Sequence, residues 1–205
     1  MEILSKLFGS EARVKIMRLF IFNSEIPYDA SMVSDKSKVV LKIVKKELAL
    51  LEKIHLIGKK TFWKTIKAKK RGKSVEKRVK SKGYQLNQEF PYITGLRQLI
   101  VSTKTLEGGE VLSRLSKAGK LKLVVIAGVF TQTKDSRLDM LVVGDNLKKP
   151  ILNSVIRSLE AELGKELLYA HFETPDFQYR LGMYDKLIRD VLDYPHEVLL
   201  DRVSN

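Results

Sequence analysis

The chain has 205 residues, of which 44% are hydrophobic and 30% are charged, and it contains no cysteine. This composition is typical of a globular protein and excludes a disulfide framework or a thiolate metal site. No apolar run approaches the roughly 20 residues that a membrane span needs, and the first residues lack the pattern of a signal peptide. We therefore expect a cytoplasmic protein with no membrane partner.

The net charge of the whole chain is +14, and the excess of positive charge is concentrated in its N-terminal half. Residues 1–105 carry 24 Lys and Arg against 9 Asp and Glu, whereas residues 106–205 carry 14 against 15. A half that holds all the excess positive charge is expected to meet a polyanion. Nucleic acid is the leading candidate, ahead of an anionic membrane surface or an acidic protein.

The N-terminal part of the sequence predicts three helices. Ser10 is placed to cap the first, over residues 11–22, whose apolar residues recur at helical spacing. A short second helix is predicted over residues 29–34 and a longer third helix over residues 40–53. Val44, Leu48 and Leu51 form an apolar side of the third helix. Another side is formed by Lys42, Lys45, Lys46 and Ala49.

Residues 57–84 have the pattern of a β-hairpin with a basic tip at 69–73. From Lys59 to Lys82 there are twelve Lys and Arg and a single acid, Glu76. A charge run of this kind is usually a solvated surface. Its place on a strand-turn-strand pattern after three helices favours nucleic-acid binding, because that order is typical of a winged helix-turn-helix.

Two segments resemble the ArsR-type family of prokaryotic regulators: LFGSEARVKI at residues 7–16 and VKKELALLEKIHLI at residues 44–57. His55 stands where that family has glycine. The resemblance covers about the first 90 residues and implies a winged helix-turn-helix domain over residues 1–92. It further implies sequence-dependent binding of double-stranded DNA by a transcriptional regulator that acts as a homodimer.

In this arrangement the third helix enters the major groove and the hairpin lies along the backbone. The predicted DNA-binding residues are Lys42, Lys45 and Lys46 on the helix, with Ile43 and Ala49 beside them, and Lys69, Lys70, Arg71 and Lys73 at the hairpin tip. No Arg, Asn or Gln on the helix offers a fork for base reading, so we expect phosphate-driven, salt-sensitive binding. We expect Trp63 to pack on the core or the hairpin, with base stacking as the alternative. RNA stays open as the polyanion.

The rest of the sequence predicts a helical linker at residues 93–119 and a small α/β domain at residues 120–205. The fold class is thus α+β for the N-terminal domain, followed by a mixed sheet with flanking helices. The predicted strands are 121–127, 138–143, 167–172 and 197–200, and the predicted helices are 150–163 and 175–192. The aromatic residues of segment 178–188 are expected to pack in a core or an interface.

Residues 121–130 and 136–145 resemble the small bacterial and archaeal nucleotidyltransferases. That family implies a Gly-Ser pair that holds a triphosphate and an Asp-x-Asp that binds two magnesium ions. Here Gly128 keeps the glycine, but Val129 replaces the serine. Asp139 matches the second aspartate, whereas Arg137 takes the place of the first.

The third acid of that family lies on a strand that here has no carboxylate before Glu173. Because a guanidinium repels Mg²⁺ and one carboxylate is not a two-metal site, we expect no enzyme activity, no metal and no cofactor. The three histidines, His55, His171 and His196, are scattered and do not indicate metal sensing.

Gly128, Arg137 and Asp139 then form a vestigial site for a nucleotide or phosphate ligand. The second domain is expected to dimerise the protein or sense a ligand. Nucleotidyltransferase activity and a role as an antitoxin-like partner protein are the alternatives.

Overall fold

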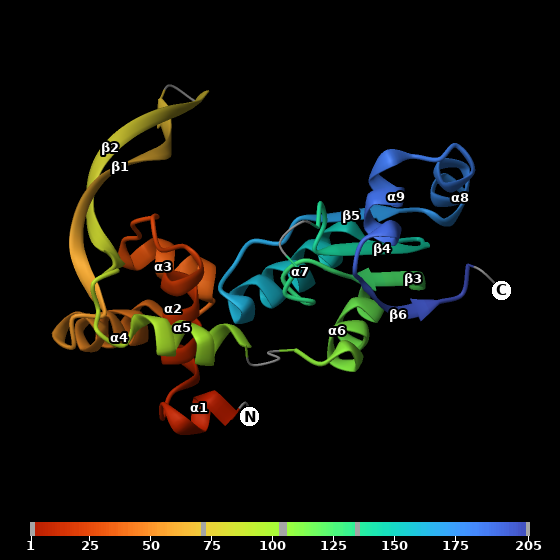
Figure 1. Cartoon of the computed structure of the whole chain (residues 1–205). Coiled ribbons are helices and arrows are strands. Elements are labelled where there is room, and N and C mark those ends of the chain that lie inside the picture. Colours follow the sequence, from red (N-terminus) through yellow and green to blue (C-terminus); the bar gives the residue numbers. More distant parts are fainter. Residues whose placement is uncertain (1–2, 71–72, 103–105, 134–135, 204–205) are drawn as a thin grey trace. The chain divides into compact units, whose positions relative to one another are not determined.

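A computed structural model describes residues 3–70, 73–102, 106–133 and 136–203; the side chains of 67–70, 73–75 and 101–102 lie outside that description. The chain divides into two compact units. Residues 1–103 and 161–165 form the N-terminal unit, and residues 104–160 and 166–205 form the C-terminal unit (Figure 1). The segment predicted as a linker is thereby shared, because its first helix belongs to one unit and its second to the other.

The N-terminal unit consists of short helices and one long hairpin. Its elements are α1 (Ile3–Leu7), α2 (Glu11–Phe22), α3 (Ala30–Ser37), α4 (Leu41–Lys53), β1 (Ile57–Lys70), β2 (Lys73–Leu86) and α5 (Ile93–Ser102). The three helices and the hairpin predicted from the sequence are confirmed, with α3 extending three residues further than expected.

Local sequence explains where these helices begin. The Ser10 hydroxyl accepts a hydrogen bond from the Arg13 amide at 3.2 Å, which caps α2 as predicted. Asp29 caps α3 by accepting from the Met32 amide at 3.0 Å. The apolar side of α4 is buried against α2 and α3, so the helices share one core whose members include Val14, Phe20, Val33, Val44, Leu48 and Leu51.

The chain leaves α4 through a left-handed residue. His55 has φ of 61°, a conformation in which glycine is favoured because it has no Cβ. This is the position at which the family that the sequence resembles has glycine and this chain has His55. The His55 carbonyl accepts a hydrogen bond from the Asn87 side chain at 2.9 Å, which ties the start of the hairpin to its end.

The hairpin is long for a globular protein. Each strand has 14 residues, and the antiparallel register runs without a shift from the pair Ile57 and Leu86 to the pair Lys70 and Lys73. Figure 1 shows the pair curving away from the helices. Its base is held by backbone hydrogen bonds in both directions between Tyr28 and Tyr84, at 2.9 and 2.8 Å.

The C-terminal unit is a mixed four-stranded sheet with flanking helices. Its elements are α6 (Gly108–Leu115), a 3-10 turn (Ser116–Ala118), β3 (Lys120–Ile126), β4 (Met140–Asp145), α7 (Lys149–Leu163), β5 (Tyr169–Phe172), α8 (Thr174–Gly182), α9 (Lys186–Asp193) and β6 (Glu197–Asp201). The strand order is β5-β4-β3-β6, in which β4 and β5 are parallel and the other pairs antiparallel. The α+β class with a mixed sheet is therefore confirmed.

One face of this sheet packs on α8 and α9. Leu123, Val125, Leu141 and Val143 from the strands form a core with residues of those helices, Phe177, Ile188 and Val191. The single helix predicted over residues 175–192 is wrong. The chain breaks after Gly182, Tyr184 takes a φ of 55°, and the Asp185 carboxylate caps α9 by accepting from the Leu187 amide at 2.8 Å.

Candidate nucleic-acid interface

The outward side of α4 is a row of lysines. Lys42, Lys45 and Lys46 are all exposed, as the sequence pattern predicted, and Lys53 lies on the same side seven residues beyond Lys46. Ile43 and Ala49 are exposed between them, also as expected. We call the set Lys42, Lys45, Lys46 and Lys53 the α4 lysine row.

The two acids of α4 do not oppose this row, because each is held by a cation. Glu47 is buried and accepts from the Arg13 guanidinium at 2.8 Å. Arg13 also donates to the Phe8 carbonyl at 2.7 Å, which fixes its direction. Glu52 pairs with Lys59 at 2.8 Å, and this hydrogen bond, with the charge behind it, raises the pKa of Lys59. The exposed side of the helix therefore keeps its positive charge.

The hairpin stem has two distinct faces. Over residues 61–65 of β1 and 78–82 of β2 the side chains alternate between exposed and half-buried, with the two-residue period of a strand. We call the exposed set the outer face of the hairpin; it consists of three cross-strand pairs, Thr61 with Lys82, Trp63 with Lys80, and Thr65 with Arg78. The half-buried set is the inner face and includes Phe62, Lys64, Val79 and Ser81.

Asp29 attaches the inner face to the helices. Its carboxylate accepts from the Lys64 ammonium and from the Ser81 hydroxyl, the latter at 3.0 Å, while it caps α3. Burial raises the pKa of Asp29, but these hydrogen bonds outweigh burial and hold the pKa below the ordinary carboxyl value. The charge of Lys64 is thus paired with Asp29 within the unit and is not available to a ligand.

Glycine is required next to this attachment. A Cβ on Gly83 would lie 2.3 Å from the Tyr28 carbonyl oxygen and 2.8 Å from the Asp29 amide nitrogen. Both are backbone atoms that cannot swing aside. The hairpin therefore approaches the start of α3 as closely as its backbone permits.

Trp63 does not pack as the sequence suggested. Its side chain lies on the outer face and is 61% exposed, so the expectation that it joins a core is wrong. The alternation along the strands puts the neighbouring aromatic, Phe62, on the inner face, where it is half-buried.

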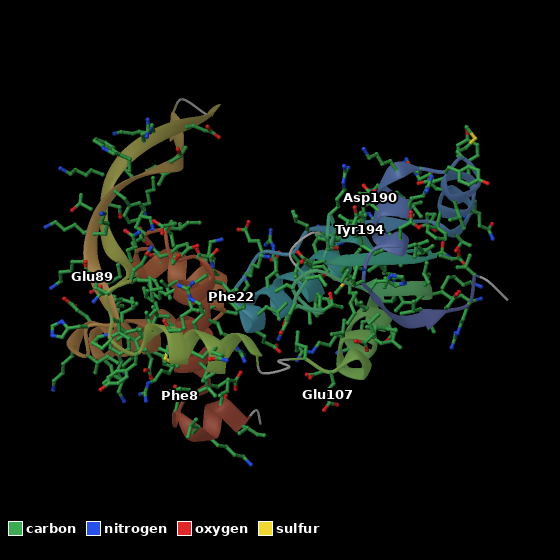
Figure 2. The ribbon with its side chains drawn as sticks, viewed as in Figure 1. Phe8, Phe22, Glu89, Glu107, Asp190 and Tyr194 are labelled. Carbon is green, nitrogen blue, oxygen red and sulfur yellow. The ribbon has the colours of Figure 1, made fainter. Side chains whose placement is uncertain are left out.

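The DNA contacts predicted for the tip of the hairpin involve side chains outside the described part of the structure. Arg71 lies outside the described residues, and the side chains of Lys69, Lys70 and Lys73 lie outside that description as well. Figure 2 shows nitrogen-tipped side chains along the described stem. Sequence reasoning missed the cations of the outer face and Lys53, although the two-residue period of the strands was a signal that could have found them.

The three residues of the predicted vestigial site are not all brought together. Gly128, at φ of 53°, lies against Asp139, and a Cβ there would be 2.3 Å from the Asp139 Oδ1 atom. Arg137 points elsewhere: its guanidinium pairs at 2.6 Å with Asp190, which lies on α9 (Figure 2).

The Asp139 carboxylate is occupied by backbone amides. It is only 5% exposed, and its two oxygens accept from the Val129 amide at 2.8 Å and the Leu168 amide at 2.9 Å. Glu173 likewise accepts from the Asn146 and Leu147 amides, at 3.2 and 3.4 Å. These acids fix loops at the ends of the strands, and no cluster of three metal-ligating side chains occurs among the described residues.

Of the two places predicted for the aromatic residues of segment 178–188, the core of the unit is wrong for Tyr179 and Tyr184, which are 68% and 77% exposed. The other place, an interface, stays a prediction.

Comparisons with family models, with curated proteins and with solved structures found no match for this chain. Within the residues that the structure describes, none of the helices has the length and apolar character that crossing a bilayer requires. The candidate interface therefore rests on its own geometry and charge.

Proposed function

We propose that this chain is a transcriptional regulator that binds double-stranded DNA with a winged helix-turn-helix. In this proposal α4 is the recognition helix and the β1–β2 hairpin is the wing. One observation carries it: the α4 lysine row is exposed, while both acids of the helix are neutralised by Arg13 and Lys59. A helix whose exposed charged side chains are all lysines matches the width and the charge of the major groove.

The chemistry of the row sets the kind of binding. Lysine contributes a point charge without the planar fork that reads guanine, so the contacts go mainly to phosphates. Each neutralised phosphate releases a counterion, which makes the affinity fall steeply with salt. Base discrimination is modest and depends on the remaining side chains of α4 and on the shape of the duplex.

We propose a non-catalytic role for the C-terminal unit, in dimerisation or in sensing a nucleotide or phosphate ligand. Two observations support this: both Asp139 oxygens already accept from backbone amides, and the position of the family's first aspartate holds Arg137, a cation that is no metal ligand and pairs with Asp190. Two copies of the basic unit on two half-sites would multiply an affinity that phosphate contacts alone keep low.

The test compares two triple variants of the full-length chain. One carries Lys42→Ala, Lys45→Ala and Lys46→Ala; the matched control carries Lys148→Ala, Lys149→Ala and Lys186→Ala, three exposed lysines of the C-terminal unit. Binding to a fluorescent duplex is measured by anisotropy over a series of salt concentrations. Both variants lose the same formal charge, so any difference between them reports position.

We expect the α4 variant to bind more weakly and to lose about 0.9 from the salt slope for each phosphate contact removed. The control variant should stay close to the parent protein. Unchanged duplex binding by the α4 variant, or an equal loss in the control, would refute the proposed interface. Selection of duplexes from a random pool then reveals whether the preferred site is palindromic, as binding by a dimer requires.

A further inference from the structure

The outer face of the hairpin carries an exposed aromatic ring. Trp63 is 61% exposed and stands opposite Lys80 in the middle of the stem. Within the part of the chain that the structure describes, no other ring stacks on it. An indole is the largest apolar side chain, and leaving it in water forgoes a substantial gain from burial.

Three cations of the adjacent strand, β2, line one side of this ring on the same face, whereas its neighbours along β1 on that face are Thr61 and Thr65. Lys80 is the direct cross-strand neighbour, and Arg78 and Lys82 are the diagonal neighbours, two residues to either side. All three are exposed, and successive ones are spaced by about 6.8 Å along the strand. On the described part of this face the nearest acid along β2 is Glu76, which is about 6.8 Å from Arg78 and roughly 14 Å from Lys80.

A flat ring beside a row of cations matches one ligand better than others. A nucleic-acid single strand offers phosphates to the cations and the face of an unpaired base to the ring, and such stacking tolerates any base. In a duplex the bases are stacked on one another and present only their edges in the grooves. A duplex therefore satisfies the cations of the outer face but leaves the indole without a partner.

We propose that the outer face of the hairpin binds single-stranded nucleic acid, with an unpaired base stacked on Trp63 and the phosphates on Arg78, Lys80 and Lys82. This site is separate from the α4 lysine row and does not rest on duplex binding by α4. It gives the chain a second mode of nucleic-acid binding, directed at opened or unstructured strands.

The chain supplies its own probe, because Trp63 is the single tryptophan among the 205 residues. The full-length protein is titrated with oligothymidylate or oligouridylate of about ten nucleotides, a length within the site size of single-strand binders. A base stacked on the indole quenches its fluorescence. We expect either oligonucleotide to quench more than a duplex of equal phosphate concentration, and the two arms identify DNA or RNA as the source of the strand.

Variants separate stacking from general attraction. Trp63→Ala should weaken binding of a labelled oligonucleotide about tenfold, as the loss of one stacked base predicts, whereas Trp63→Phe should retain most of the affinity. Tyr179→Ala, which removes an exposed aromatic ring from the C-terminal unit, is the matched control and should bind like the parent protein. Equal binding by Trp63→Ala and the parent overturns the proposal, as does quenching no greater than that by the duplex.

One further measurement keeps this inference distinct from the proposed function. The variant with alanine at Lys42, Lys45 and Lys46 should lose duplex binding yet still show oligonucleotide quenching. If α4 does not bind a duplex at all, quenching by the single strand still supports the hairpin site. If quenching disappears in that variant, the outer face has no site of its own.

Discussion

Each of the two units contains a buried aspartate beside a glycine that leaves no room for a Cβ. In the N-terminal unit these are Asp29, 8% exposed, and Gly83; in the C-terminal unit they are Asp139, 5% exposed, and Gly128. Both carboxylates bridge segments far apart in the sequence. The two sites differ in what donates to the carboxylate, and this difference separates their roles.

Asp29 accepts from the charged side chain of Lys64 and from the Ser81 hydroxyl, so it connects α3 to a cationic hairpin. Asp139 accepts from two backbone amides, and the nearby Arg137 pairs with Asp190 instead. An aspartate that sits in a motif-like position is thus not necessarily a ligand-binding acid. Its donors, not its place in the sequence, show what it does.

The substitution Asp139→Ala is the strongest test of the difference between the two aspartates. The substitution leaves two part-buried amides, those of Val129 and Leu168, without their acceptor, and each loss costs about 1–3 kcal/mol. We expect the free energy of unfolding of the C-terminal unit to fall by about 3 kcal/mol. Hydrogen exchange of the β4 amides measures the change within that unit alone.

Asp29→Ala is the counterpart and should cost less, about 1–2 kcal/mol, mainly through the lost helix cap. Its donor Lys64 is partly exposed and can be solvated again. An equal or larger loss for Asp29→Ala would show that the two sites are not distinguished by their donors.

Gly83→Ala tests the close approach of the hairpin base. The new Cβ would stand 2.3 Å from the Tyr28 carbonyl and force apart the backbone pair of Tyr28 and Tyr84. We expect the N-terminal unit to lose about 2 kcal/mol of unfolding free energy in urea denaturation. Gly58→Ala is the matched control in the same hairpin, since nothing lies within 4 Å of its Cβ, and it should leave stability nearly unchanged.

The smallest expected effect is a difference in pH dependence. The pKa of Asp29 lies below its ordinary value of 3.8, so the carboxylate contributes its full stabilisation above that value. The contribution is lost as the pH falls through the folded-state pKa. We expect Asp29→Asn to flatten the acid side of the stability curve of the N-terminal unit, measured against the parent protein. A curve parallel to that of the parent would contradict the role given to this carboxylate.

The sequence predicted those features that depend on local chemistry. The cap at Ser10, the apolar and basic sides of α4 and the hairpin follow from spacing and residue type, and the structure confirms them. The break near Tyr184 was missed, although Asp185 is a residue type that begins helices and Gly182 one that ends them. Helical spacing on both sides of the break concealed it.

Partners across the chain were not predictable in the same way. The pairing of Arg137 with Asp190 joins residues 53 positions apart, and Lys64 reaches back 35 positions to Asp29. A place for Trp63 in the core was wrongly expected, because the face of a strand residue depends on which side packs on helices. One sequence gives the alternation but not which of the two faces is covered.

The lysines of α4 have a consequence for how this protein would change over time. Lysine and arginine carry the same charge, so exchanging one for the other leaves the attraction to phosphates in place. Arginine adds a planar fork that pairs with guanine, which a lysine lacks. If α4 binds a duplex as proposed, the row is a surface on which base preference could be acquired one position at a time without loss of overall affinity.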